Sequence, residues 1–164
     1  MKKWTIDVSA FLLRLAAGLI FFPHGWGKVF GAGGAATFAQ DMPSYGIPVF
    51  FGYVAAYAEL VCAVLLIAGL LTRLDALLLA GTMFVAAFIV QLPDALRDPQ
   101  GGGNKFFAAL HGIELPLALL AICLAVILLG AGRFSLDFLL RVDERAAGLV
   151  RRKEKGQAGV PVLH

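Results

Sequence analysis

The stretch Phe11–Gly31, FLLRLAAGLIFFPHGWGKVFG, decides the fold of this chain. It is long and apolar enough to cross a bilayer, because about 20 helical residues at about 1.5 Å each span a hydrocarbon layer of about 30 Å. The stretch also carries Arg14 near one end and His24 and Lys28 near the other. Hydrocarbon does not solvate charge, so ionisable groups at that depth must face a protein interior or a wet cavity. We therefore expect a transmembrane helix whose polar side chains are covered by further helices.

The whole chain has the composition of a membrane protein. Its 164 residues are 60% hydrophobic and 15% charged, with a mean hydropathy of +0.83. Soluble domains are about 45–50% apolar and about 25% charged. So few charges cannot cover a water-exposed surface, and one membrane domain is predicted. The net charge of +3 does not indicate a nucleic-acid partner, because the basic residues cluster beside the membrane segments.

Four apolar segments are predicted to span the membrane as helices, since every backbone polar group in lipid needs an internal partner. Arg14 and the length of the first segment argue against a cleaved secretory signal. The junction at 72–73 is so short that it forces an antiparallel hairpin. The predicted fold is thus an all-α integral membrane bundle of four transmembrane helices, in a domain of residues 1–137 followed by a basic, amphipathic to disordered tail at 138–164. The expected spans are 8–30, 49–71, 74–92 and 106–130.

Lysine and arginine counts predict the orientation of the bundle. With four crossings, the N-terminus, the 72–73 turn and the tail share one side of the membrane. That side carries Lys2, Lys3, Arg73, Arg133, Arg141, Arg145, Arg151, Arg152, Lys153 and Lys155. The other side carries Arg97 and Lys105, with Lys28 at its edge. Because cytoplasmic loops are rich in basic residues, we place both termini in the cytoplasm of a bacterial cell whose cytoplasmic membrane holds this multi-pass protein.

Ionisable side chains inside the predicted spans form the candidate site. A charge at a helix centre costs about 2.5–3.5 kcal/mol of insertion free energy. We therefore expect each of these side chains either to pair with another group or to have a function. Counted from the outer end at 1.5 Å per residue, His24 lies about 9 Å deep, Glu114 about 12 Å and Glu59 about 15 Å. We expect these groups to line one outward-opening pocket for a small ligand or a proton relay. The candidates for it are His24, Lys28, Glu59, His111, Glu114 and Arg14, with Gln91 nearby.

Two of these assignments stay open. Arg14 lies towards the cytoplasmic end and would need its full reach to pair with Glu59, so Asp75 or Asp137 is an alternative partner. All of these charges could instead form structural salt bridges that tie the four helices together.

Small residues and cysteines in the spans have simpler interpretations. Gly18 and Gly25, seven residues apart on one helix face, predict close helix packing. Cys62 and Cys123 lie inside apolar runs, which is typical of buried thiols. No CxxC motif and no His/Cys cluster with metal-ligand spacing is present, so no metal site is predicted.

The order of several short motifs resembles the DoxX/DoxD family of small four-helix bacterial membrane proteins. The resemblance covers almost all of the chain up to Asp137. The matching pieces are Arg14 with Gly18, HGWGK at 24–28, GIP at 46–48, Glu59, GLLTR at 69–73, Glu114 and GAGRFSLD at 130–137. One branch of that family, DoxD, is a subunit of a thiosulfate:quinone oxidoreductase, and other members are linked to redox and thiol stress. The resemblance therefore implies the four-helix fold and a redox role.

Three functions remain as hypotheses. The first is a subunit of a membrane oxidoreductase, linked to quinone or to thiol redox chemistry, with a ligand beside Glu59, protons handled by His24 or Glu114, and electrons from a redox partner protein. The second is a non-enzymatic scaffold or assembly subunit that uses the basic tail to dock a partner or anionic lipid. The third is a small-solute transporter that acts as a homo-oligomer. It ranks last, because four helices enclose little volume and the sequence shows no inverted repeat.

Overall fold

The computed structural model describes residues 2–97 and 105–140, and within these ranges the chain forms helices and their connections without a β-strand. Four helices are long and apolar enough to cross a membrane: Trp4–Phe30, Val49–Ala68, Thr72–Arg97 and Ala109–Leu129. The predicted all-α bundle of four transmembrane helices is confirmed. The side of the membrane on which the termini lie stays a prediction.

The described elements follow one another with short connections. In chain order they are α1 (Lys2–Phe30), α2 (Gly34–Asp41), the 3₁₀-helix η1 (Met42–Tyr45), α3 (Val49–Ala68), α4 (Thr72–Val85), the π-helix η2 (Ala86–Gln91), α5 (Leu92–Arg97), α6 (Lys105–Leu129) and α7 (Leu136–Leu140).

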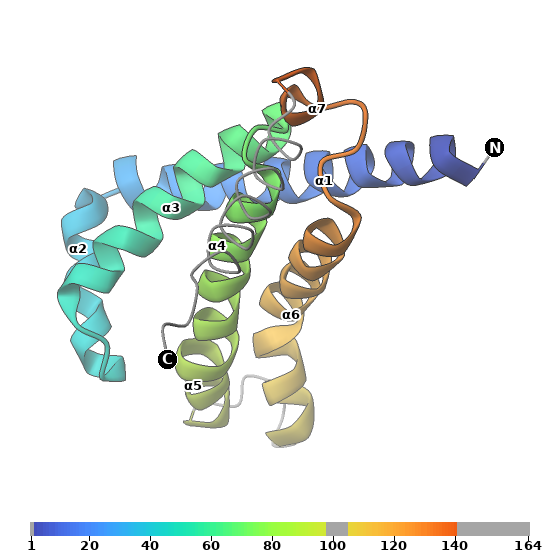
Figure 1. Cartoon of the computed structure of the whole chain (residues 1–164). Helices are drawn as coiled ribbons and strands as arrows, with labels where there is room; N and C mark the ends of the chain where they lie inside the picture. Colours follow the sequence, from blue (N-terminus) through green and yellow to red (C-terminus); the bar gives the residue numbers. More distant parts are fainter. Residues whose placement is uncertain (1, 98–104, 141–164) are drawn as a thin grey trace, which may run out of the picture.

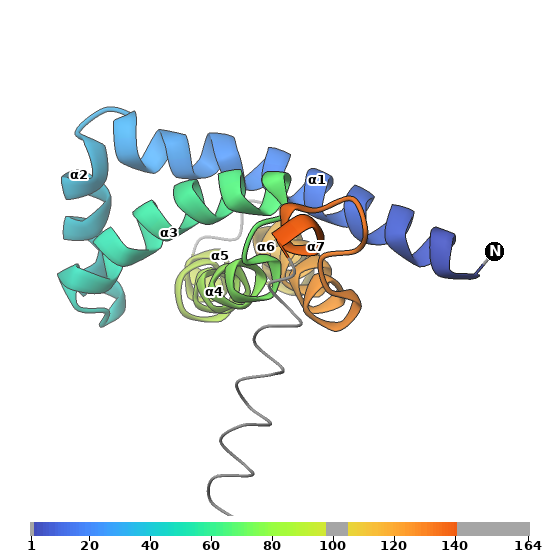
Figure 2. The same ribbon diagram turned by 45° about the horizontal axis from the view of Figure 1, so that its top comes forward.

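Two helix pairs build the bundle. α1 runs along α3, α4 runs along α6, and the two pairs cross steeply (Figures 1 and 2). Phe21, Leu79 and Val126 belong to the buried core between the pairs. Large apolar side chains cover the outside, for example Leu128, which is 81% exposed. Such a surface suits lipid, whose tails are as apolar as leucine.

Glycines let α1 approach α3 closely. A Cβ atom added at Gly25 would lie 2.5 Å from the backbone nitrogen of Leu60, and one added at Gly18 would lie 2.4 Å from Cγ1 of Ile67. Neither position therefore has room for a larger residue. The predicted close packing on this face is found, and at Gly25 it brings α1 against the backbone that carries Glu59.

The turn between α3 and α4 is held by a carboxylate from α7. The backbone nitrogens of Leu71 and Thr72 donate hydrogen bonds of 2.7 and 2.8 Å to the two carboxylate oxygens of Asp137. The Asp137 nitrogen in turn donates to the carbonyl of Gly69 at 2.8 Å. Because the first N–H groups of a helix have no partner within the helix, Asp137 satisfies the start of α4. The segment after α6 is thereby fastened to this turn.

The third spanning helix is longer than expected. The expected spans 74–92 and 106–130 leave residues 93–105 as a connecting loop, but the helix continues through α5 to Arg97. The π-helix η2 ends at Gln91, two residues before Pro93. A wider turn changes the hydrogen-bond pattern at the position where proline lacks an N–H group. Residues 98–104 of the expected loop lie outside the described residues.

A side-chain cap begins α7, just before the tail. The Phe138 nitrogen donates a hydrogen bond of 3.1 Å to Oγ of Ser135, which caps α7. The rest of the predicted amphipathic and disordered tail, residues 141–164, lies outside the described part of the chain.

Candidate functional site

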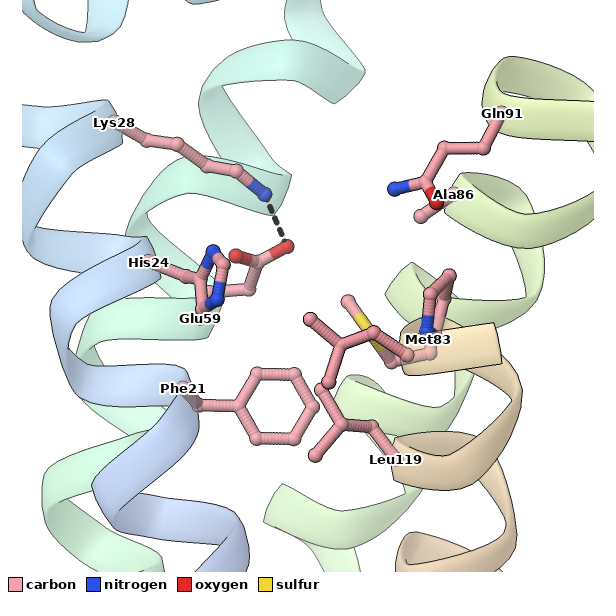
Figure 3. Close-up of a pocket in the computed structure, with 10 residues that line it drawn as sticks. Phe21, His24, Lys28, Glu59, Met83, Ala86, Gln91 and Leu119 are labelled. Atoms are coloured by element: carbon pink, nitrogen blue, oxygen red, sulfur yellow. Dashed lines mark hydrogen bonds and ion pairs between the residues drawn. The ribbon is translucent and has the colours of Figure 1, made fainter. Parts of the chain in front are cut away.

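A cavity of about 130 Å³ lies between the two helix pairs. Figure 3 shows its polar side chains in the upper part of the view, with Phe21, Met83 and Leu119 below them. Ten residues from α1, α3, α4, η2 and α6 line this pocket: Phe21, His24, Lys28, Glu59, Met83, Ala86, Gln91, Leu115, Pro116 and Leu119.

An ion pair forms the polar side of the pocket. Nζ of Lys28 on α1 donates a hydrogen bond of 2.5 Å to Oε1 of Glu59 on α3. The side chain of Glu59 is 2% exposed and that of Lys28 is 24% exposed. The second carboxylate oxygen of Glu59, Oε2, is buried and has no hydrogen-bond partner among the described residues. A buried carboxylate oxygen without a partner is costly, so this atom is a place where a ligand, a water or a proton would be stabilised.

Local packing aims Lys28 at Glu59. Gly25, one turn before Lys28, allows α1 to touch the backbone of α3 at Glu59 and Leu60. The ammonium group of Lys28 also lies 4.7 Å from the ring centroid of Phe38 on α2, a cation–π contact. These contacts fix the lysine at the edge of the pocket.

His24 and Gln91 complete the polar rim. His24 lies one turn before Lys28 on the same face of α1, and its ring stands beside the Glu59 carboxylate in Figure 3. Its side chain is exposed, unlike that of Glu59. Gln91 is the last residue of η2 and lies across the pocket from Lys28. π-helical turns shift the direction of the side chains that follow them and are frequent at functional sites.

The structure does not place His111 and Glu114 in the pocket. Their side chains are 74% and 62% exposed, and Nδ1 of His111 lies 3.4 Å from Oε2 of Glu114. The buried side of α6 carries Pro116, Leu119 and Cys123 at helical spacing, and His111 and Glu114 lie off that stripe. Counting residues from the membrane surface gave their depth, but it carries no information on the direction in which they point.

Arg14 also lies away from the pocket. Its side chain is 1% exposed, and Nη2 donates a hydrogen bond of 2.6 Å to the carbonyl of Phe134. The guanidinium group packs on Gly69, where a Cβ atom would collide with it, and the Asp137 carboxylate acts on it electrostatically. Of the partners considered for Arg14, Asp137 is therefore the one that the structure brings near, and Glu59 is not.

Sequence reasoning missed most of the apolar wall. Phe21, Met83 and Leu119 were not singled out, because apolar residues in an apolar span give no contrast. Phe21 could have been predicted from the sequence, since it precedes His24 and Lys28 by three and seven residues on one helix face.

Beyond the pocket, a polar contact joins η1, before α3, to α5. Oη of Tyr45 in η1 donates a hydrogen bond of 2.7 Å to Oδ2 of Asp94 in α5. This hydrogen bond raises the pKa of the Tyr45 phenol, with smaller contributions from burial and from the charge of Asp94. The phenol therefore stays protonated, and keeps donating, throughout the neutral pH range. Among the described residues, no group of three His, Cys, Asp or Glu side chains could hold a metal ion.

Comparison with known proteins gives a consistent set of relatives. A family model described as DoxX matches residues 9–92 of the chain. A Bacillus subtilis protein named "Putative oxidoreductase CatD" is 39% identical over 115 residues, which cover 70% of this chain and 81% of that protein. "Inner membrane protein YqjF" of Escherichia coli is 30% identical over 140 residues, covering 85% of this chain and 97% of its own.

A further relative is an uncharacterised membrane protein of Mycobacterium tuberculosis, 31% identical over 148 residues, which cover 85% of this chain and 86% of that protein. No solved structure matches the chain significantly. The range matched by the family model contains the pocket residues from α1, α3, α4 and η2, while those from α6 follow it.

Proposed function

The chain belongs to the DoxX family and is a multi-pass protein of the cell membrane, and from this premise we propose that it is a redox subunit whose pocket beside Glu59 binds the ring of a quinone-like ligand. The observation that carries the proposal is the pocket itself. It joins a buried, partly unpaired carboxylate and a lysine to an apolar wall inside a membrane bundle.

The size and the lining of the pocket suit one ring. A protein cavity of about 150 Å³ holds one benzene molecule, and this pocket measures about 130 Å³. Phe21, Met83 and Leu119 offer apolar and aromatic contacts to the face of a ring (Figure 3). Lys28 and Gln91 offer hydrogen-bond donors at the rim. Ligand pockets typically combine such an apolar lining with a few polar groups that fix orientation.

The position of the pocket suits a ligand that arrives from the membrane. His24 of α1 and Leu115 of α6 line it and are also exposed on the outside of the bundle. An isoprenoid chain attached to the ring could lie along this apolar surface.

The chain's own groups would bind the ligand and hold protons. A bound quinone would supply the electron-accepting ring, and electrons would come from a partner protein. Lys28 and Gln91 would donate hydrogen bonds to its carbonyl oxygens, while Glu59 and His24 would hold protons beside it. The name of the Bacillus subtilis relative supports redox chemistry. Cys62 and Cys123 are both buried, which favours the quinone-linked form of the hypothesis over thiol chemistry.

The test is a binding titration of a short-chain quinone to the full chain in lipid nanodiscs. Hydrogen bonds to charged groups contribute about 1.5–3 kcal/mol, and about 1.4 kcal/mol corresponds to a tenfold change in affinity. Glu59→Gln and Lys28→Met should therefore each weaken binding about tenfold or more. Glu114→Gln is the matched control on the outside of α6 and should bind like the wild type. Equal affinity in all four proteins, or none in the wild type, would contradict the proposal.

The outward-facing pair on α6 favours a second candidate, an assembly subunit. His111 and Glu114 lie near the start of a membrane-spanning segment yet point away from the bundle. Polar side chains at membrane depth often contact another helix. If α6 binds a partner or a second copy of this chain, disulfide cross-linking of a cysteine placed at 111 should trap that neighbour, whereas a cysteine at Leu128 on the same helix should not.

A further inference from the structure

A second group of buried polar side chains lies at the other end of the bundle, beside the turn between α3 and α4. Thr72 is 0% and Asp75 is 2% exposed, and both belong to the third membrane-spanning helix. Oγ1 of Thr72 and Oδ2 of Asp75 have no hydrogen-bond partner among the described residues. The ligand pocket uses neither residue, so this group needs its own explanation.

Asp75 has a carboxyl group that forms no ion pair with a cation among the described residues. The thiol of Cys62 on α3 donates a hydrogen bond to the carboxyl group, and the charged group that acts on it is the Asp137 carboxylate of α7. Arg14 of α1 binds the Phe134 carbonyl and acts on Asp137. A lone carboxylate inside a membrane is strongly unfavourable, so we expect Asp75 to carry a proton. Its unpartnered oxygen is then a hydroxyl group that can pass the proton on.

Cys62 connects Asp75 to the pocket. It follows Glu59 by three residues on α3, which places it about 4.5 Å further along the helix axis and on the same side. Oε2 of Glu59 also has no partner in the part of the chain that the structure describes. Thr72 precedes Asp75 by three residues in the first turn of α4. Four buried groups that can hold or pass a proton thus follow one another along the contact between α3 and α4.

We propose that Glu59, Cys62, Asp75 and Thr72 form an internal proton path from the ligand pocket to the α3–α4 turn at the opposite end of the bundle. Each group would receive a proton on one atom and release one from the same or the neighbouring atom, so no net charge accumulates and nothing is oxidised or reduced. The path deepens the proposed function, because a quinone that is reduced in the pocket takes up protons there.

In the proposed path, Lys28 prevents proton transfer between Glu59 and the pocket. The groups that face Glu59 are Lys28 and His24 from α1 and Gln91 from η2. The hydrogen bond from Lys28 to Oε1 holds the Glu59 carboxylate in place. Without the lysine, Glu59 can take up a proton from Cys62 and release it towards exposed His24 at the mouth of the pocket.

The experiment measures proton entry into liposomes that contain the full chain and a trapped pH-sensitive dye, driven by a potassium diffusion potential. The wild type should be nearly as tight as empty liposomes. Lys28→Met should let protons in at least fivefold faster. Adding Asp75→Asn or Glu59→Gln to Lys28→Met should return the rate to that of the wild type, while adding the surface change Asp41→Asn should leave the fast rate unchanged.

Two results would overturn the path: a Lys28→Met variant as tight as the wild type, or a Lys28→Met/Asp75→Asn variant as leaky as Lys28→Met. No quinone is present, so failure of the path and failure of quinone binding are separate results. If Asp75→Asn does not fold, infrared spectroscopy of folded wild type and Asp75→Glu decides. A protonated-carboxyl band that differs in frequency between these two proteins supports the path, and its absence at neutral pH contradicts it.

Discussion

At the scale of single residues, the ion pair with Lys28 stabilises the buried carboxylate of Glu59. Removing one partner of a buried ion pair costs about 3–5 kcal/mol, because it leaves the other charge uncompensated. Lys28 is 24% exposed, so solvent reduces this cost. The pair thus contributes to both the stability of the bundle and the electrostatics of the pocket.

A double-mutant cycle tests this pairing. Glu59→Gln and Lys28→Met should each lower the free energy of unfolding by about 2 kcal/mol, and the double variant should lose at least 1 kcal/mol less than the sum. The measurement is reversible unfolding in detergent. The same cycle with His111→Ala and Glu114→Gln should show a coupling below about 0.5 kcal/mol, because that pair is exposed. Additive losses at Lys28 and Glu59 would show that the two charges are not paired.

Residue counting predicted part of this site. The spacing of His24 and Lys28 on one face, and the similar depth of Glu59, follow from helix geometry alone. The structure brings these three together. The outward direction of Glu114 could not be predicted, because rotation of α6 depends on which of its faces packs on α4, and both faces are apolar.

At the scale of elements, the contact between α1 and α3 depends on glycine. At Gly25 the backbone of α3 occupies the space that a side chain would need, whereas at Gly27 no atom lies within 4 Å of an added Cβ. The two positions are two residues apart in one helix and differ in this contact.

Gly25→Ala should therefore destabilise the protein by about 1–3 kcal/mol through overpacking and should also displace Lys28 from Glu59. Gly27→Ala should be neutral or stabilise by up to about 1 kcal/mol, because alanine is the better helix former. Thermal unfolding in detergent measures both effects. Equal effects of the two substitutions would contradict the close packing at Gly25.

The helices themselves were largely predictable, and one feature was not. Apolar runs with short polar connections indicate four spans and the hairpin at 72–73. The π-helix before Pro93, which packs beside α6, leaves no such signal in the sequence. It continues the third spanning helix beyond α4 and places Gln91 at the pocket.

At the scale of the whole molecule, charge predicts which side faces the cytoplasm. The basic residues near the membrane lie mostly on the side of the N-terminus and the tail. A fluorescent protein fused after His164 should therefore fluoresce, and a phosphatase that is active only outside the cytoplasm should be inactive at the same site. The opposite pair of results would reverse the orientation, and the pocket would then open towards the cytoplasm.

Composition alone predicted a membrane protein, and the order of its motifs predicted its family. Neither reveals the ligand, because a ligand is recognised by a few side chains from separate helices. Lys28, Glu59 and Gln91 come together only after α1, α3 and η2 have packed.

The most direct test of the central claim is mass spectrometry of small molecules retained by the protein after purification from membranes in mild detergent. Wild type and Glu114→Gln should each retain a quinone-like molecule, and Glu59→Gln should retain at most about a tenth as much, in line with a loss of about 1.4 kcal/mol. Retention of the same molecule in equal amounts by all three proteins would place its site elsewhere and contradict the role given to the pocket.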